Sequence, residues 1–189
     1  ISVSINSDGT IVAIGAYAGN QNYAGNVKVY KNISGDWTQI GDDIVGEADD
    51  DFSGYAVSLN SAGDIVAIGA PYNDGVNGNS SGHVRVYQNI SGNWTQIGDD
   101  IDGEGASDVS GDSVSLNAAG DIVAIGADKN HSSGHVRVYR NISGNWTQIG
   151  DDIDGEAVND SSGFSVSLNS VGDIVAIGAP DNDPNGRSS

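Results

Sequence analysis

The 189-residue sequence contains no cysteine and only three prolines. The absence of cysteine excludes disulfides, thiolate metal sites and cysteine nucleophiles. Long apolar runs are also missing, because none approaches the roughly 20 residues that a membrane-spanning helix needs. No proline interrupts a predicted strand, and no segment has the apolar period of an amphipathic helix.

Basic residues are scarce as well. Lys and Arg number 7 against 26 Asp and Glu, so the formal net charge is −19. Such a chain is repelled by nucleic-acid phosphates and by anionic membrane surfaces. We therefore expect no nucleic-acid partner and no membrane insertion. The charge is compatible with divalent cations and with high solubility.

Aromatic residues make up 6% of the chain and hydrophobic residues 37%, whereas glycine occurs 28 times. So few aromatic rings exclude a large aromatic core, and small side chains must therefore pack closely. The composition fits many short strands that are joined by tight turns.

One stretch of sequence occurs four times. SGYAVSLNSAGDIVAIGAP at 53–71 returns as SGFSVSLNSVGDIVAIGAP at 162–180, and shorter forms occupy 1–16 and 110–127. The second and third units are nearly copies over HVRVYQNISGNWTQIGDDIDGE, where only Gln88 and Arg140 differ. Repetition with a period of about 50 residues is typical of a repeat architecture.

Each unit carries four strand signals, for example over 55–60, 65–70, 83–89 and 93–99. The first strand alternates small and apolar residues, which suits a position near a crowded axis. The second strand is apolar on both faces, so we expect the second strands at 11–16, 65–70, 122–127 and 174–179 to be the most buried segments. Asp64, Asp121 and Asp173 are expected to close the hairpin turns between these two strands.

These signals predict an all-β fold, a β-propeller built of four-stranded antiparallel blades. A β-sandwich is the alternative, but it gives no reason for a repeat after every four strands. The predicted units are blade 1 at 1–54, blade 2 at 55–111, blade 3 at 112–163 and the first half of a fourth blade at 164–189. About 3.5 blades are fewer than a closed ring needs, so we expect a segment of a longer array or an oligomer.

The stretch GFSVSLNSVGDIVAIGAP, followed by GHVRVY and DGE, resembles the FG-GAP repeat of integrin α-subunit propellers and of related bacterial surface proteins. Gly54-Tyr55 and Gly69-Ala70-Pro71 match its two signatures, whereas Asp112 and Asp128 replace the aromatic residue and the proline in the third unit. The resemblance implies an extracellular or cell-surface propeller.

The family's calcium loop lies between the first two strands, but the segments NSAGD and NSVGD are too short here to supply the oxygen ligands of Ca²⁺. A weaker calcium candidate is DNDPNG, through Asp181, Asp183 and Asn185. Otherwise no cofactor is expected. The other acidic stretches, such as 99–108 and 151–160, could hold Ca²⁺, but turn formation is the favoured interpretation.

The third strands collect basic residues. Lys28, Arg85 and Arg137 lie on them, and His83 and His135 begin two of them. The spacing His-x-Arg places both side chains on one face of a strand. Pairing with acidic neighbours is favoured over a ligand-binding ring.

Near-identical repeats work against catalysis, because an active site needs unlike residues that converge on one point. The sequence therefore predicts a non-enzymatic surface propeller for adhesion or multivalent binding of a protein or glycan. The first alternative is a lectin in which Trp37, Trp94 and Trp146 stack on sugars, although packing of these rings between blades is favoured. The second is an enzyme similar to the propeller glycosidases.

Overall fold

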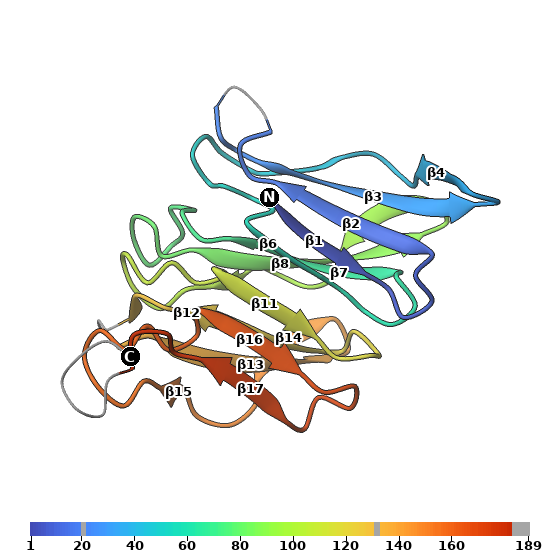
Figure 1. Cartoon of the computed structure of the whole chain (residues 1–189). Helices are drawn as coiled ribbons and strands as arrows, with labels where there is room; N and C mark the ends of the chain where they lie inside the picture. Colours follow the sequence, from blue (N-terminus) through green and yellow to red (C-terminus); the bar gives the residue numbers. More distant parts are fainter. Residues whose placement is uncertain (20–21, 131–132, 183–189) are drawn as a thin grey trace.

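The computed structural model describes residues 1–19, 22–130 and 133–182, and it shows stacked antiparallel sheets, the blades of a β-propeller (Figure 1). Blade 1 holds β1 (Ser2–Ile5), β2 (Ile11–Ala16), β3 (Asn26–Ile33), β4 (Asp36–Gln39) and β5 (Ile44–Val45). Blade 2 holds β6 (Ala56–Leu59), β7 (Ile65–Ala70), β8 (His83–Ile90), β9 (Asn93–Gln96) and β10 (Ile101–Asp102). Blade 3 holds β11 (Ser113–Leu116), β12 (Ile122–Ala127), β13 (His135–Ile142), β14 (Asn145–Gln148) and β15 (Ile153–Asp154). A final hairpin consists of β16 (Ser165–Leu168) and β17 (Val175–Gly178), which makes about three and a half blades.

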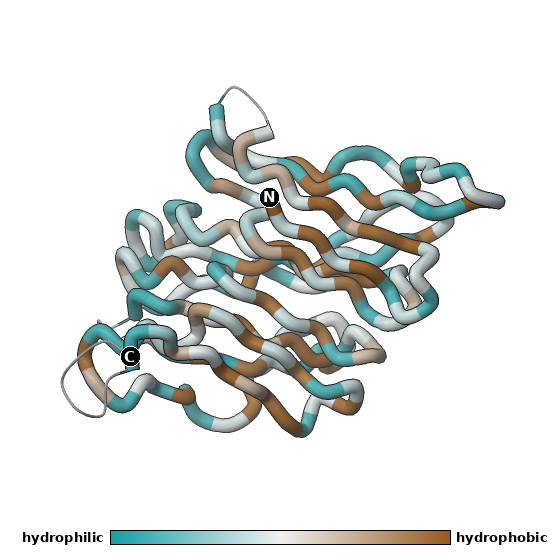
Figure 2. The backbone as a smooth tube through the Cα atoms, viewed as in Figure 1, coloured by the Kyte–Doolittle hydropathy of each residue, from teal (hydrophilic) through white to brown (hydrophobic). Residues whose placement is uncertain are grey.

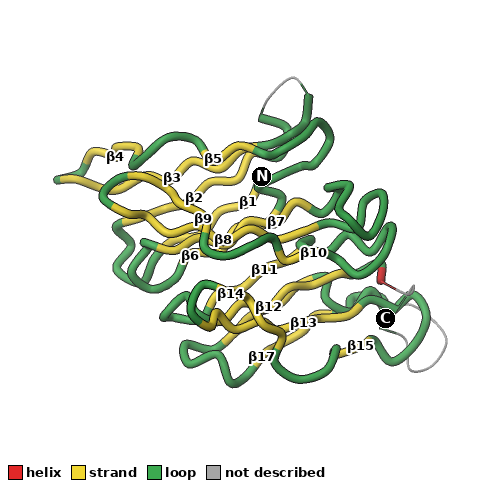
Figure 3. Tube along the Cα trace, turned by 180° about the vertical axis from the view of Figure 1, so that it is seen from behind, coloured by secondary structure: helices red, strands yellow, loops and turns green. Residues whose placement is uncertain are grey.

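The outermost strand of each blade consists of two pieces. In blade 2, β9 pairs with the second half of β8, and β10 pairs with its first two residues, His83 and Val84. The same division occurs at β4 and β5 in blade 1 and at β14 and β15 in blade 3. The fourth strand predicted at 93–99 thus ends at Gln96, and an acidic turn separates it from the short β10. Strands dominate the body of each blade, and the loops gather at its ends (Figure 3).

The first strand of each unit is innermost, as its small residues predicted. Strands β1, β6, β11 and β16 contact one another in succession. Serine hydroxyls join them, because Ser4 Oγ accepts a hydrogen bond from the backbone N–H of Leu59 at 2.9 Å and Ser58 Oγ accepts one from Leu116 at 2.9 Å. The repeated serines therefore bond neighbouring blades as well as fitting the narrow space.

The hairpin turns after the first strands are built around asparagine. Asn60 Oδ1 accepts hydrogen bonds from the backbone of Gly63, Asp64 and Ile65, and its Nδ2 donates to Asp64 Oδ1 at 2.8 Å. Gly63 has a φ of 75°, which glycine adopts without steric cost. Asn117 with Asp121 and Asn169 with Asp173 repeat the arrangement. The prediction that these aspartates close the turns is confirmed.

The core lies between blades, where the two-faced apolar strands pack. Apolar segments follow the strands and hydrophilic segments follow the loops (Figure 2). In β7, Ile68 is 1% exposed, and β12 is buried throughout. The prediction is wrong for the outer two copies, because Ile14 in β2 is 37% exposed and Ile174, just before β17, is 65% exposed. A second strand is buried on both faces only where a blade covers each face.

Candidate functional site

The interface between blades 1 and 2 carries a polar cluster on the third strand, β8. Arg85 donates from Nη2 to the carbonyl oxygen of Val45 at 3.1 Å and pairs through Nη1 with Glu47 Oε1 at 3.3 Å. Its guanidinium also lies 5.6 Å from the ring centroid of Tyr87. Alternation along the strand places His83, Arg85 and Tyr87 on the same face. That face meets the preceding blade. The prediction that the basic residues of the third strands pair with acidic neighbours is confirmed for Lys28, Arg85 and Arg137.

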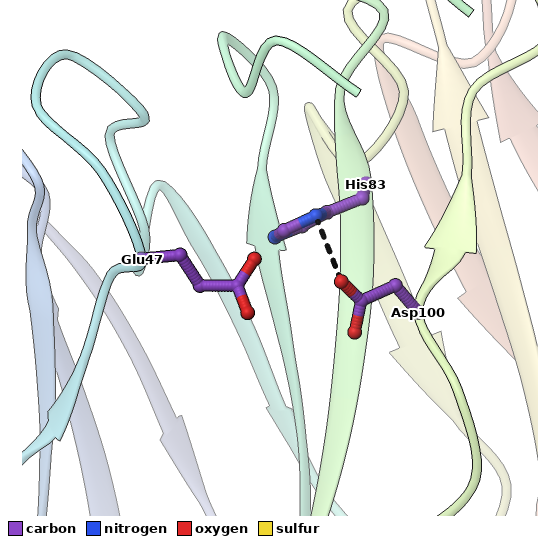
Figure 4. A group of neighbouring side chains, drawn as sticks. All are labelled: Glu47, His83 and Asp100. Carbon is purple, nitrogen blue, oxygen red and sulfur yellow. Dashed lines mark ion pairs between the residues drawn. The ribbon is translucent and has the colours of Figure 1, made fainter. Parts of the chain in front are cut away.

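His83 lies between two carboxylates from different blades (Figure 4). Asp100 Oδ2 is 3.5 Å from His83 Nδ1, and Glu47 projects toward the ring from the loop after β5. The three side chains each offer a ligand atom, and these atoms lie within 4.8 Å of one another. The imidazole is buried, whereas Asp100 is half-buried and Glu47 is exposed. The group is therefore open to solvent from the side of Glu47.

The same cluster recurs one blade further along the chain. Glu104, His135 and Asp152 form an equivalent group, with His135 Nδ1 3.8 Å from Glu104 Oε2. Arg137 Nη1 lies 3.8 Å from Glu104 Oε1 and its Nη2 donates to the carbonyl oxygen of Asp102 at 2.8 Å. Two copies of one arrangement show that blade packing, rather than one local loop, builds it.

Blade 1 has different residues at the corresponding positions. Asn26 aligns with His83 by strand register, because each is paired with the last residue of its second strand. Asn26 Nδ2 donates to Asp43 Oδ2 at 3.1 Å, and Lys28 Nζ lies 3.2 Å from the same oxygen. This position thus holds an amide–lysine–carboxylate network without an imidazole.

Burial controls the charge of both histidines. Burial, reinforced by the positive charge of Arg85, lowers the pKa of His83 to about 4 despite the nearby Asp100 carboxylate. Burial and the Arg137 charge likewise lower the pKa of His135. Both imidazoles are therefore neutral at pH 7, and each has one nitrogen with a free lone pair.

A pocket lies beside each polar cluster, between the outer parts of neighbouring blades. The first has a volume of about 250 Å³ and is lined by Asp42, Asp43, Ile44, Val45, Tyr87, Asn93 and Trp94. The second has a volume of about 180 Å³ and is lined by Asp99, Asp100, Ile101, Asp102, Tyr139, Asn145 and Trp146. Each combines aromatic rings with carboxylates and an amide. Their size is below the ~300–1,000 Å³ of sites for drug-sized ligands, so each fits one small polar unit.

The three tryptophans occupy two kinds of position. Trp94 and Trp146 pack against the two buried clusters between blades and also line the pockets. Trp37 is 47% exposed on the open face of blade 1, where it lines an apolar hollow of about 330 Å³ with Val12, Ile14 and Tyr30. Of the three tryptophans, only Trp94 and Trp146 therefore line pockets in which a ring that can stack on a sugar lies beside carboxylates.

One aspartate in each crossover loop shapes a turn. Asp51, Asp108 and Asp160 each accept a backbone N–H three residues earlier, at 2.8, 2.6 and 2.8 Å. Of the calcium candidates, Asp181 Oδ2 accepts a hydrogen bond from Ser161 Oγ at 3.0 Å. Asp183 and Asn185 lie outside the described residues. A calcium site at 181–186 therefore stays a prediction.

A second candidate region contains side chains that are not repeated in every blade. It lies at the end of the blades where the first strands begin and the second strands end. Five aromatic rings gather there across blades 1 and 2: Tyr17, Tyr23, Phe52, Tyr55 and Tyr72. Phe52 is central, with ring centroids 5.6 Å from Tyr17, 5.6 Å from Tyr23 and 5.0 Å from Tyr72. Tyr72 is 43% exposed and Tyr55 is 37% exposed. The cluster thus presents aromatic surface to solvent.

Acidic residues of blade 3 border this aromatic cluster. Burial and the negative charge of Asp128 raise the pKa of Asp112 to about 6. The Asp112 charge, with burial, raises the pKa of the Tyr55 phenol, which places the two groups within electrostatic reach. Asp128 is 5% exposed and accepts a hydrogen bond from Lys129 Nζ at 2.8 Å. This bond raises the pKa of Lys129. A carboxyl that titrates near neutrality is suited to proton transfer.

Sequence reasoning found these groups only in part. Asp112 and Asp128 stood out as departures from the repeat, but the aromatic rings beside them come from two other units. Glu47 and His83 are separated by a whole strand pair, so their spacing carries no signal of contact. The recurrence of Glu after the fourth strand and of His-x-Arg on the next third strand was the available signal.

Comparison with models of known protein families finds no match, and comparison with curated proteins finds none either. The resemblance to FG-GAP repeats therefore stays a prediction. Among the residues that the structure describes, no helix is long and apolar enough to cross a membrane.

Solved propellers do resemble the fold. One is a putative 6-phosphogluconolactonase from Bacteroides fragilis NCTC 9343, with a TM-score of 0.60 and 13% identity over 93% of this chain. Another is a putative 6-phosphogluconolactonase from Bacteroides uniformis ATCC 8492, with a TM-score of 0.61 and 13% identity over 95% of this chain. This chain spans 40% and 47% of their lengths. At this identity the likeness shows the fold.

This comparison contradicts the prediction that the chain is not an enzyme, because both similar propellers carry the name of an enzyme. The premise of that prediction also fails in the structure. Repeats were expected to present identical surfaces, yet Asp112, Asp128 and the tyrosines of blades 1 and 2 bring unlike groups to one end of the fold. The chain is an all-β propeller, and its repeats differ in the acidic and aromatic residues at this end of the blades.

Proposed function

We propose that this propeller binds carbohydrate through the pockets between its blades. The observation that supports the proposal is that two equivalent pockets each combine a tryptophan, a tyrosine and at least two aspartates. Aromatic rings offer apolar faces to the C–H groups of a sugar ring, and carboxylates accept hydrogen bonds from its hydroxyls. Trp94 and Trp146 are held in place by their indole N–H bonds, so each pocket is preorganised.

Repetition of the pocket makes the proposed binding multivalent. Each site is small and partly open, so a single sugar unit would be bound weakly. Two sites on one rigid body gain avidity toward a glycan that spans both. Such a protein is suited to adhesion at a cell surface or outside the cell, and the proposal includes this location and a glycan partner.

The test begins with a glycan array and continues with calorimetric titration of the sugar that binds. Asn93 and Asn145 line the pockets at equivalent positions, and Asp36 is their counterpart on the open face of blade 1. We expect Asn93→Ala and Asn145→Ala each to weaken binding, the double variant to weaken it further and Asp36→Ala to leave it unchanged. Absence of glycan binding, or equal binding by the double variant and the unchanged chain, would contradict the proposal.

A second candidate function is acid–base hydrolysis of an uncharged sugar lactone or glycoside at Asp112. Its support is the raised pKa of this carboxyl beside an aromatic surface, together with the enzyme name of the similar propellers. For a lactone, the Asp112 carboxylate would accept a proton from water as the water oxygen bonds to the carbonyl carbon. The ring C–O bond then breaks, and the leaving oxygen takes that proton back.

The charge of this region favours an uncharged substrate. Asp112 and Asp128 lie near the cation of Lys129, and the whole chain has a net charge of −19. A phosphorylated sugar, as in the name of the similar propellers, would be repelled. We therefore expect hydrolysis of an uncharged aldonolactone or glycoside with an apparent pKa near 6, and loss of activity in Asp112→Asn. Preference for a phosphorylated lactone would contradict this candidate.

A further inference from the structure

We propose that the two Glu–His–Asp clusters each bind one divalent transition metal of the zinc class, which bridges neighbouring blades. The first site comprises Glu47, His83 and Asp100. The second comprises Glu104, His135 and Asp152. In each site the glutamate comes from the preceding blade and the other two ligands from the following one, so the metal would cross-link the blades.

The spacing of the donor atoms supports this assignment. His83 Nδ1 and Asp100 Oδ2 are 3.5 Å apart, and His135 Nδ1 and Glu104 Oε2 are 3.8 Å apart. Both distances exceed the 2.7–3.2 Å of an N–H···O hydrogen bond. They are close to the edge of a tetrahedron, about 3.4 Å, that follows from Zn–N and Zn–O bonds of about 2.0–2.1 Å. The remaining ligand atom of each site lies within 4.8 Å of the other two, so the three groups would move closer together around a bound ion.

The buried imidazoles provide a second, independent observation. His83 and His135 are each 1% exposed. Within the described part of the chain, His83 Nε2 and both ring nitrogens of His135 lack hydrogen-bond partners. A buried polar atom without a partner costs free energy. His135 Nδ1 is the nitrogen that lies 3.8 Å from Glu104 Oε2, so an ion bound in the second site would give this atom the partner that it lacks.

The neighbouring arginines are compatible with an ion. In the second site, Glu104 directs Oε1 toward Arg137 and Oε2 toward His135. The carboxylate can therefore pair with Arg137 through one oxygen and bind the metal ion through the other. Arg137 is also held by the carbonyl oxygen of Asp102. Glu104, Asp152 and Arg137 together carry one net negative charge, and a divalent ion would turn it into one net positive charge.

The ligand set selects the metal. Imidazole favours zinc and its neighbours among the transition metals, whereas Ca²⁺ takes six to eight oxygens. Three protein ligands also leave the fourth tetrahedral position for water. We therefore expect these clusters to bind Zn²⁺ or Co²⁺ and not Ca²⁺, which the sequence suggested only for the acidic loops, as an alternative to turn formation.

The test is a calorimetric titration of the protein with Zn²⁺ after treatment with EDTA and desalting. We expect two bound ions in the unchanged chain, one in His83→Gln and none in the double variant with His135→Gln. Retention of one ion in His83→Gln shows that the variant is folded. Tetrahedral Co²⁺ gives visible absorption, which should fall by half and then vanish in the same series.

Glutamate variants give a matched control that avoids the buried core. Glu47 contributes from an exposed loop, and Glu156 is its counterpart in the loop after β15. Glu47→Gln should weaken one of the two sites at least tenfold, and Glu156→Gln should leave both unchanged. Zinc should raise the melting temperature, and Ca²⁺ should leave these sites empty. Absence of zinc binding, or two ions in the double histidine variant, would overturn the proposal.

Discussion

Trp94 of blade 2 donates its indole N–H to the main-chain carbonyl oxygen of Ile40 in blade 1, at 2.9 Å. Trp146 repeats the contact with Ile97 at 2.8 Å. These bonds join blades that share no strand ladder, so the tryptophans contribute to the interface through both packing and a directed hydrogen bond.

Replacing Trp94 by Phe should destabilise the protein by about 1–3 kcal/mol, because the carbonyl oxygen of Ile40 loses its donor within the blade interface. Urea unfolding measures the change. Trp37→Phe is the matched control, since Trp37 is 47% exposed, and it should change stability by less than about 0.5 kcal/mol. Equal effects of the two substitutions would show that the interblade bond contributes nothing.

Replacing Ile68 by Ala should cost about 2–5 kcal/mol, because Ile68 is 1% exposed between two blades and its removal leaves a cavity. Ile14 has the same place in β2 but is 37% exposed. Ile14→Ala should therefore cost clearly less in the same denaturation experiment. A larger loss at Ile14 would mean that the open face of blade 1 is covered in solution.

Replacing Ser58 by Ala should destabilise the protein by about 1–3 kcal/mol, because the backbone N–H of Leu116 loses its acceptor between the inner strands. Ser167 is the equivalent residue in β16 and is exposed, so Ser167→Ala should be nearly neutral. Hydrogen exchange at Leu116 provides a direct measurement, and the exchange should accelerate only in Ser58→Ala.

Stability without added metal should fall as the pH drops from about 6.5 to about 4, because His83 must become charged in a buried site. The folded-state pKa lies below the unfolded value, so the unfolded chain binds more protons in this range. The contribution is present above pH 6.5 and is on the order of 3 kcal/mol. His83→Gln should flatten this part of the urea midpoint–pH curve, and an unchanged curve would contradict the assignment.

Asp112 should act in the opposite direction. Its folded-state pKa is raised to about 6, so the folded protein binds more protons than the unfolded chain between about pH 4 and pH 6. Its stabilising contribution is present below pH 4 and is lost as the pH rises through 6. Asp112→Asn should therefore stabilise the protein at pH 7, by about 1 kcal/mol after allowance for solvent screening. A loss of stability at pH 7 would show that the ionised carboxylate makes favourable contacts.

The sequence by itself determined the repeat, the order of the strands and the innermost place of the serine-rich strands. These features follow from local chemistry: alternation sets the faces of a strand, and an asparagine followed three residues later by glycine closes its own turn. The turn role of Asp64, Asp121 and Asp173 was predictable for the same reason.

Tertiary structure decided the features that depend on a neighbouring blade. Identical second strands are buried in β7 and partly exposed in β2, because burial depends on what covers each face. Glu47 lies close to His83, and the charge of Asp112 raises the pKa of Tyr55, only because adjacent blades pack against each other. Side-chain spacing along one chain carries no information on such contacts, since the packing of whole sheets brings these residues together.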